Sequence, residues 1–179
     1  MSDNLRTVQK ICHVMEVIYR VLTIICLVAL ICCVIGVVAL SICSFFPNAK
    51  SLIEDKSGRN LMQLIGLCLA GFVISMAHFI VLKSHRDFFA MEQKAGTPFT
   101  VEGAKAFRTL GIMNIVVPIA TTVVASIIGV IFKCRGDFRL EIEVGLGIAM
   151  ILLSFVFAYG AELEEKKKGT PEEKKLPQA

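Results

Sequence analysis

Four long apolar stretches without Asp, Glu, Lys or Arg constrain the fold of this 179-residue chain more than any other feature; they are residues 21–49, 61–82, 109–132 and 144–161. A helix crosses the ~30 Å hydrocarbon core of a bilayer with about 20 predominantly apolar residues. Lipid offers no hydrogen-bond partner to a free backbone amide, so each stretch must be helical there. The sequence therefore predicts an all-α, integral membrane four-helix bundle with spans at about 21–46, 61–82, 109–132 and 142–161.

Composition supports one membrane domain over residues 21–163 and no soluble globular unit. Hydrophobic residues make up 55% of the chain, against about 45–50% in ordinary soluble domains. The first apolar stretch is longer than the core of a signal peptide, and no small-residue cleavage site follows it. We expect this stretch to remain in the membrane as an anchor.

The distribution of Lys and Arg predicts the orientation. Thirteen of the 19 lie in the N-terminal arm, in the segment between the second and third spans and in the C-terminal tail, and six lie in the other two loops. Cytoplasmic segments carry the excess of positive residues. We therefore expect a multi-pass protein of the cell (plasma) membrane with both termini in the cytoplasm, and a charged tail over 164–179 that is disordered.

Residues 1–20 are predicted to form a cytoplasmic amphipathic helix. Their apolar residues recur three and four positions apart, which is the spacing of one helix face. The stripe consists of Leu5, Val8, Cys12, Met15, Tyr19 and Leu22. Three interpretations remain open: a helix on the membrane surface, a short coiled-coil seam, or a helix packed on other segments of this protein.

A cytoplasmic helical hairpin is predicted between the second and third spans. Helical character continues beyond Leu82, Gly96 stands where a helix ends, and Pro98 follows as a stop. Thr100 is suited to cap the next helix. Aromatic and basic residues on this 83–109 hairpin form a candidate partner-binding site, or alternatively pack its two arms together. The candidate residues are Phe88, Phe89, Pro98, Phe99, Phe107 and Arg108.

The third span carries the most polar side chains. Its candidate intramembrane polar face consists of Asn114, Pro118, Thr121, Thr122 and Ser126. We favour interhelical hydrogen bonding for this face, worth only ~0.6 kcal/mol per bond on average. The alternative is a small polar cavity, and in both cases Pro118 should bend the helix.

Small residues predict where helices approach closely. The second span contains two pairs spaced four apart, Gly66 with Ala70 and Gly71 with Ser75. The fourth span opens with Gly145, Gly147 and Ala149.

The sequence lacks the arrangements of residues that would support catalysis or metal binding. No span contains a charged residue, which argues against a pump or a secondary transporter. His78 and His85 share a face, and His13 is within reach, but no other span carries a histidine at depth. We expect no catalytic residue, no metal and no cofactor, and therefore no enzyme. Cys43 and Cys134 are expected at the outer ends of their spans, where a disulfide is a hypothesis.

Two motifs resemble a known family. GTPFT at 96–100 with FRTLG at 107–111, and FAYGAEL at 157–163, are similar to the entrance to span three and the exit from span four of the YoaS-like bacterial membrane proteins. This family has a domain of unknown function with four predicted spans. The chain departs from the family after Leu163. The resemblance implies a bacterial, membrane-linked regulatory role, through the small helix-turn-helix regulators often encoded beside family members.

The sequence predicts a non-enzymatic membrane protein with a regulatory or partner-binding role through the 83–109 hairpin. The alternative is a small transporter, channel or lipophilic-ligand-binding protein that uses the polar face of the third span. Expected partners are the lipid bilayer, a cytoplasmic or membrane protein and a second copy of the chain, and no nucleic acid.

Overall fold

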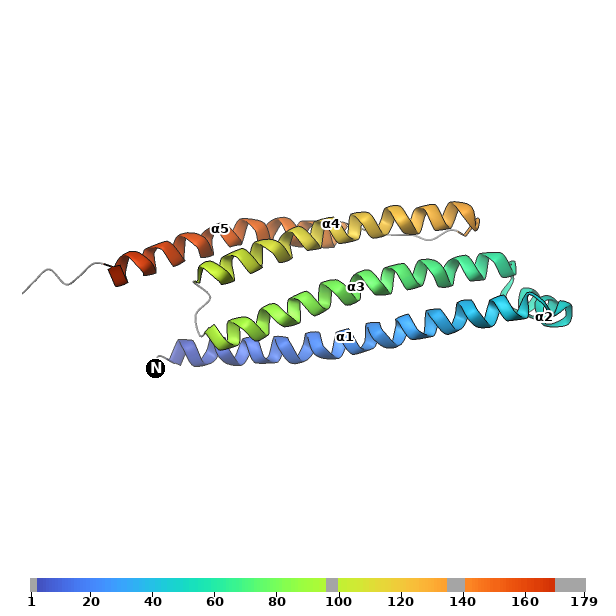
Figure 1. The fold of residues 1–179 in the computed structure, drawn as a ribbon, viewed down its shortest axis with the longest axis horizontal. Coiled ribbons are helices and arrows are strands. Elements are labelled where there is room, and N and C mark those ends of the chain that lie inside the picture. Colours follow the sequence, from blue (N-terminus) through green and yellow to red (C-terminus); the bar gives the residue numbers. More distant parts are fainter. Residues whose placement is uncertain (1–2, 96–99, 135–140, 170–179) are drawn as a thin grey trace, which may run out of the picture.

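The computed structural model describes residues 3–95, 100–134 and 141–169, and these ranges are helical apart from short connections. The helices are α1 (Asp3–Cys43), α2 (Pro47–Ser57), α3 (Leu61–Ala95), α4 (Val101–Ile131) and α5 (Glu141–Gly169) (Figure 1). Four of them are long and apolar enough to cross a membrane, over Gln9–Cys43, Leu61–Lys94, Val101–Ile131 and Val144–Leu163. The predicted set of four long apolar helices is confirmed.

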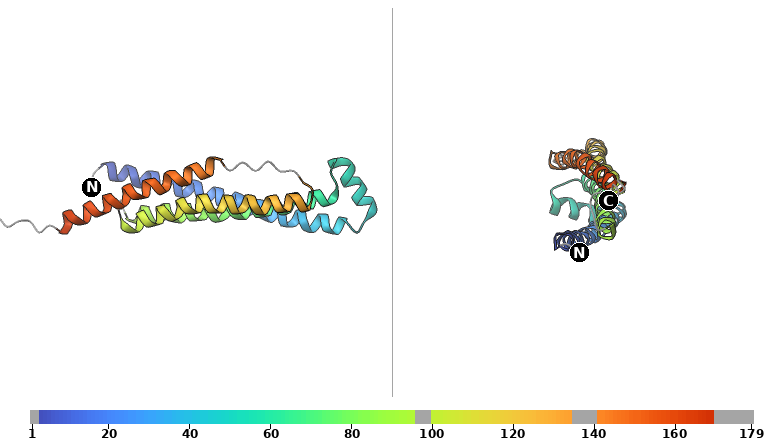
Figure 2. Two further views of the ribbon diagram at one scale, coloured as in Figure 1. Left: turned by 90° about the horizontal axis from the view of Figure 1, so that it is seen from above. Right: turned by 90° about the vertical axis from the view of Figure 1, so that its left-hand side faces the viewer.

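The four long helices form a curved row. Helix α1 packs on α3, α3 on α4, and α4 on α5, while α1 and α5 do not meet anywhere in the described ranges. The end-on view in Figure 2 shows this row as an arc. In water, the many exposed apolar side chains of these helices would favour closing the arc, whereas in a lipid environment, whose tails are as apolar as leucine, this driving force would be missing.

Small residues make the helix interfaces. Most buried apolar side chains are alanines: Ala70, Ala77, Ala104, Ala125 and Ala161. Between α1 and α3, the Cys68 sulfur lies against Gly36 and the Cys33 sulfur lies against Gly71, where added Cβ atoms would come within 3.1 and 3.2 Å of these sulfurs.

Backbones come closest between α4 and α5. A Cβ at Gly147 would lie 2.8 Å from the Gly111 carbonyl oxygen, and a Cβ at Gly111 would lie 2.9 Å from that of Gly147. The predicted close approach of backbones is thus confirmed at Gly147, whereas the space at Gly66 is filled by the side chain of Phe132. Gly145 has open space around it.

Two of the long helices extend beyond the predicted spans. Residues 3–20 continue in line with the first long helix, because α1 is unbroken from Asp3 to Cys43. They therefore extend that helix instead of forming a separate one. Helix α5 runs to Gly169, so residues 164–169 of the tail predicted to be disordered are helical. Residues 170–179 lie outside the described ranges.

Helix α2 occupies a loop for which no helix was predicted. Pro47 opens the helix at a position where its missing N–H is not needed. Gly58 ends it with φ +63°, a left-handed conformation that glycine adopts at little cost, and its amide donates to the Glu54 carbonyl oxygen at 2.9 Å. The Glu54 carboxylate accepts from the Leu61 amide at 3.0 Å and so caps α3.

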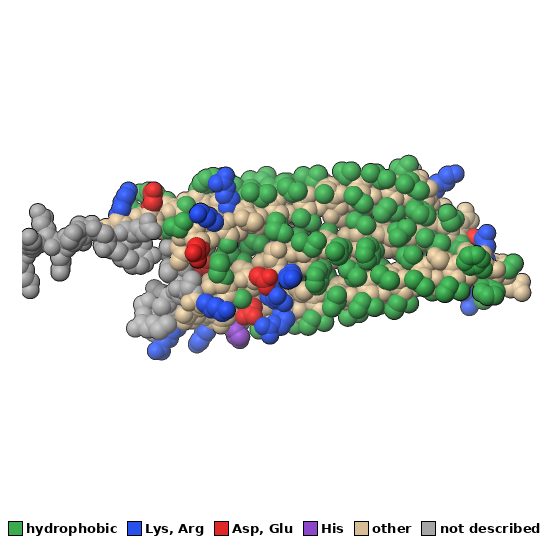
Figure 3. All heavy atoms as spheres, in the orientation of Figure 1, with side chains coloured by type: hydrophobic (Ala, Val, Ile, Leu, Met, Phe, Trp, Pro, Cys, Tyr) green, Lys and Arg blue, Asp and Glu red, His purple; other side chains and the backbone are tan. Residues whose placement is uncertain are grey.

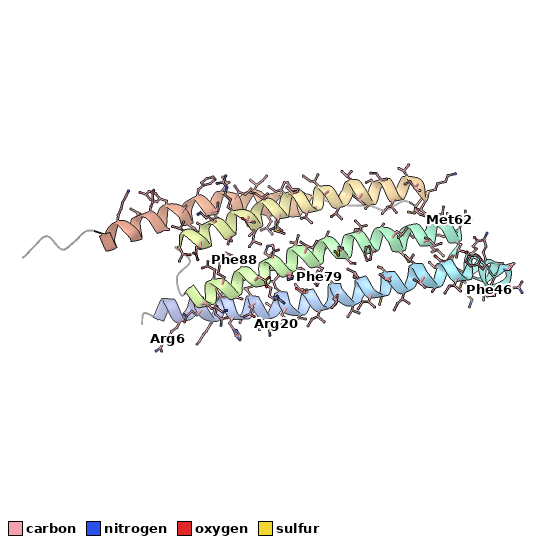
Figure 4. All side chains as sticks on the ribbon, in the orientation of Figure 1. Arg6, Arg20, Phe46, Met62, Phe79 and Phe88 are labelled. Atoms are coloured by element: carbon pink, nitrogen blue, oxygen red, sulfur yellow. The ribbon has the colours of Figure 1, made fainter. Side chains whose placement is uncertain are left out.

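Charged side chains gather at the two ends of the row and leave the middle apolar (Figure 3). Of these two ends, we name one "the charged end". It contains the start of α1, the end of α3, the start of α4 and the end of α5 (Figure 1). Arg6 and Arg20 lie there, whereas Phe46 and Met62 lie at the opposite end (Figure 4).

Candidate functional site

An aromatic row crosses all four long helices at the charged end. It consists of Tyr19 on α1, Phe88 and Phe89 on α3, Phe107 on α4 and Phe157 on α5. Ring centroids lie 5.5 Å apart for Tyr19–Phe89, 5.4 Å for Phe88–Phe89, 5.4 Å for Phe88–Phe107 and 5.2 Å for Phe107–Phe157. These distances are those of favourable aromatic pairs. Phe88, Phe89 and Phe107, predicted as partner-binding residues, thus pack the helices together.

A polar node lies beside the aromatic row. The His85 ring stacks on Tyr19 with centroids 5.1 Å apart, and the Asn114 Nδ2 atom lies 3.2 Å from His85 Nε2. His85 Nδ1 is 2.8 Å from the Val81 carbonyl oxygen, which can only accept. Nδ1 therefore carries the hydrogen, and Nε2 accepts from the amide of Asn114, as a neutral imidazole does.

Asn114 is the centre of this node. It is only 5% exposed, and its Nδ2 also donates to the Leu110 carbonyl oxygen at 3.0 Å and to the Met150 sulfur at 3.3 Å. An amide nitrogen has two hydrogens and here meets three acceptors, so one hydrogen is shared. Asn114 thereby joins α3, α4 and α5 through a single side chain.

A buried carboxylate adjoins the start of α4. Glu92 is 7% exposed, and its Oε1 atom is buried without a hydrogen-bond partner. It lies against Gly103 in the first turn of α4, where the helix dipole favours negative charge. The capping residue predicted there is confirmed, because Thr100 Oγ1 accepts from the Gly103 amide at 2.9 Å.

Sequence analysis missed Glu92 and the part that His85 plays. Their spacing held the signal, because positions 85, 88, 89 and 92 recur at three and four residues and so share one helix face. Because His85 and Glu92 share a helix face with two phenylalanines, they could have been predicted to lie in a helix interface.

A pocket opens between α4 and α5 at the charged end. Its volume is about 500 Å³. It is lined by Val101, Ala104, Lys105, Arg108, Ser154, Phe155, Ala158, Tyr159 and Glu162. The Arg108 guanidinium carbon lies 5.4 Å from the Phe155 ring centroid, which is cation–π distance. The pocket therefore combines two cations, one carboxylate and two aromatic rings, of which only Arg108 was a predicted site residue.

The residues of the predicted polar face of α4 differ in burial. Asn114 and Pro118 are buried, Thr121 and Thr122 are half-buried, and Ser126 is exposed. The Thr121 hydroxyl donates to the Val117 carbonyl oxygen of its own helix at 2.7 Å. None of these residues lines the pocket between α4 and α5. Helix α4 continues through Pro118 without a break.

The histidines are not assembled into one site. His13 Nδ1 lies 3.4 Å from Gln93 Nε2, and His78 Nδ1 lies 2.9 Å from the Ile74 carbonyl oxygen. Within the described ranges, no group of three or more His, Cys, Asp or Glu residues is placed to hold a metal ion.

Two further predictions concern the connections. Cys43 and Cys134 are both free thiols, so the hypothesised disulfide is absent from the structure. Pro98 and Phe99, the other predicted partner-binding residues, lie outside the described ranges, as does the predicted hairpin tip at 96–99.

Comparison with protein-family models, with curated proteins and with solved structures found no match for this chain. A fold of long apolar helices does not specify an activity, so function has to be argued from the site. The charged end is the part of the described chain where aromatic, polar and charged groups of all four long helices converge.

Proposed function

We propose that this chain is a non-enzymatic, multi-pass protein of the cell membrane that binds a protein partner through its 83–109 segment in a regulatory role. One observation carries the proposal: the long helices continue, packed together, well past their apolar stretches. Helix α3 has 35 residues. At about 1.5 Å per residue it is roughly 50 Å long, against ~30 Å of hydrocarbon.

In this proposal the charged end lies in the cytoplasm with both termini. The Lys and Arg excess supports this side, because positive residues are retained on the cytoplasmic face. The four-span layout also fits the likeness to the YoaS-like bacterial family, and we extend the proposal to membership of that family.

The protruding part of α3 offers a charged surface. Lys83, Asp87 and Lys94 are exposed. Positions 83 and 94 are eleven residues apart, close to three helical turns, so they share a face. Val101 and Glu102 in the first turn of α4 are exposed as well. We propose that a partner contacts this surface, while the aromatic row holds the two arms in a fixed geometry. Binding residues on such rigid elements keep their positions well.

Site-specific photo-crosslinking in cells tests the proposal. A photoreactive phenylalanine at Lys94 or Val101 should give a discrete protein adduct that mass spectrometry identifies. The matched control is Leu52 on α2 at the opposite end, which is 57% exposed and should not give this adduct. Adducts with lipid alone at Lys94 and Val101 would overturn the proposal. Phe88 and Phe107 are poor positions for the probe, because their rings pack inside the molecule.

The alternative function, a transporter, channel or lipophile-binding protein using the polar face of α4, has weaker support. The Asn114 amide already has three acceptors, and the Thr121 hydroxyl is bonded within its own helix. A transport site needs polar groups that are available to the substrate.

A further inference from the structure

The pocket between α4 and α5 has one wall from each helix. On α4 its residues stand at 101, 104, 105 and 108, and on α5 at 154, 155, 158, 159 and 162. Both sets follow the spacing of one helix face. A volume of about 500 Å³ is typical of sites for small molecules. Two of its lining residues, Ala104 and Ala158, have side chains too small to fill it.

The pocket lies at the boundary between apolar and charged surface. Arg108 directly precedes the charge-free stretch 109–132, Lys105 lies three residues before Arg108, and Glu162 directly follows the stretch 144–161. Positions 101 to 108 rise about 10 Å along α4 at helical geometry. The headgroup layer of a bilayer is roughly 5–8 Å thick on each side. If the apolar stretches fill the hydrocarbon core, the pocket is at the depth of lipid headgroups.

Its lining matches an anionic amphiphile. Lys105 and Arg108 face one carboxylate, Glu162, so the lining carries one net positive charge. The Phe155 ring holds the Arg108 guanidinium from one side. The edge of a guanidinium presents paired N–H donors that match two phosphate oxygens. Tyr159 is 63% exposed, with an apolar ring and a hydroxyl that can donate, as is common at membrane interfaces.

We propose that this pocket binds the headgroup of an anionic phospholipid from the leaflet at the charged end. Arg108 and Lys105 bind the phosphate oxygens, Tyr159 donates a further hydrogen bond, and the acyl chains run toward the apolar middle beside Phe155. Glu162 accepts from a hydroxyl of the headgroup, which favours a monoanionic lipid with a hydroxyl-bearing headgroup. The site shares Val101 with the proposed partner surface but none of that surface's charged residues, and it does not depend on which side of the membrane the charged end faces.

Native mass spectrometry of the full chain tests this site, with phosphatidylglycerol as the probe and phosphatidylcholine as the neutral reference. Charge-assisted hydrogen bonds are strong enough that we expect the wild type to prefer phosphatidylglycerol by roughly tenfold or more. The double variant Lys105→Gln with Arg108→Gln should lose this preference. The matched control, Lys83→Gln with Lys94→Gln, removes the same charge elsewhere and should keep it within about twofold.

A variant that binds the lipid more strongly complements the loss of binding in the double variant, because misfolding would not increase lipid retention. Glu162→Gln removes the negative charge beside the phosphate but keeps a side-chain oxygen that can accept from the headgroup hydroxyl, so it should raise retention of phosphatidylglycerol about threefold. An equal loss of preference in the two double variants would overturn the proposal in favour of non-specific charge attraction. Displacement of the lipid by soluble glycerol phosphate would overturn it in favour of a site for a free phosphate ester. Unchanged or weaker retention by Glu162→Gln would also contradict it.

Discussion

The α1–α3 and α4–α5 interfaces both rely on glycine, but they use it differently. Between α1 and α3, each glycine receives a cysteine sulfur from the other helix, so side chains separate the backbones. Between α4 and α5, Gly111 and Gly147 bring carbonyl oxygens against Cα atoms, so the backbones themselves are in contact. The α1–α3 interface can therefore adjust through flexible side chains, whereas the α4–α5 interface is fixed at one crossing and opens into a pocket beyond it.

The largest expected effect comes from filling the backbone crossing. Gly147→Ala places a methyl group 2.8 Å from the Gly111 carbonyl oxygen, and backbone cannot yield as a side chain does. We expect the free energy of unfolding in detergent to fall by about 2–3 kcal/mol. Gly36→Ala, which meets only the Cys68 sulfur at 3.1 Å, should cost under ~1 kcal/mol.

Gly145→Ala is the control for helix propensity, because it stands in open space on the same helix. Equal losses for Gly147→Ala and Gly36→Ala would remove the distinction between the two interfaces.

The second-largest loss of stability is expected at the polar node. Asn114→Leu leaves His85 Nε2 buried without a donor and removes the contacts to Leu110 and Met150. We expect a loss of about 1–2 kcal/mol in the same assay. Thr121→Val should cost under ~0.5 kcal/mol, because that hydroxyl bonds only within its own helix. A cost for Thr121→Val as large as that for Asn114→Leu would mean that the contacts of Asn114 to α3 and α5 add no stability.

The aromatic row is expected to contribute slightly less. Phe107→Leu removes ring contacts to both Phe88 and Phe157, and so should cost about 1 kcal/mol. Amide hydrogen exchange should rise at the charged ends of α3 and α4 and stay unchanged at α2. Phe45→Leu, at a ring that is 82% exposed, should leave exchange and stability unaltered. Faster exchange spread evenly over all helices would count against a local role.

The smallest effect concerns the start of α4. Thr100→Ala removes the acceptor of the Gly103 amide and should weaken the helix start by about 0.5–1 kcal/mol. The readout is exchange of the first-turn amides of α4, which should quicken while the Gly111–Gly147 crossing stays protected. Thr100→Ser keeps the hydroxyl and should behave as wild type. If it does not, the hydroxyl is not the source of the stabilisation.

Chain-local features were predictable from the sequence. Charge-free length marked the four apolar helices, and the Thr100 cap was predictable from its position. The arrangement of the helices was not predictable, because the buried and the exposed surfaces of the long helices are both apolar and the residue types do not separate them. Helix α2 was missed even though Pro47 and Gly58 bracket it in the way that helix ends prefer.

The candidate site was predictable only in part, because residue type identifies single residues and does not identify their neighbours. Arg108, Phe88, Phe89 and Phe107 were identified by residue type, and the structure adds the neighbours that decide what each does. A phenylalanine near a lysine suggests docking until the helix beside it is known. The pocket depends on two segments about 50 positions apart, Val101–Arg108 and Ser154–Glu162, and no local pattern connects them.

The row of helices has a consequence for biogenesis. Helices that are neighbours in space are also successive along the chain, apart from the short α2, so no interface waits for a segment made much later. Each long helix leaving the ribosome meets a partner that is already in place, and few long loops have to close. Assembly can therefore keep pace with synthesis, one helix at a time, without holding an earlier helix unpaired until the end.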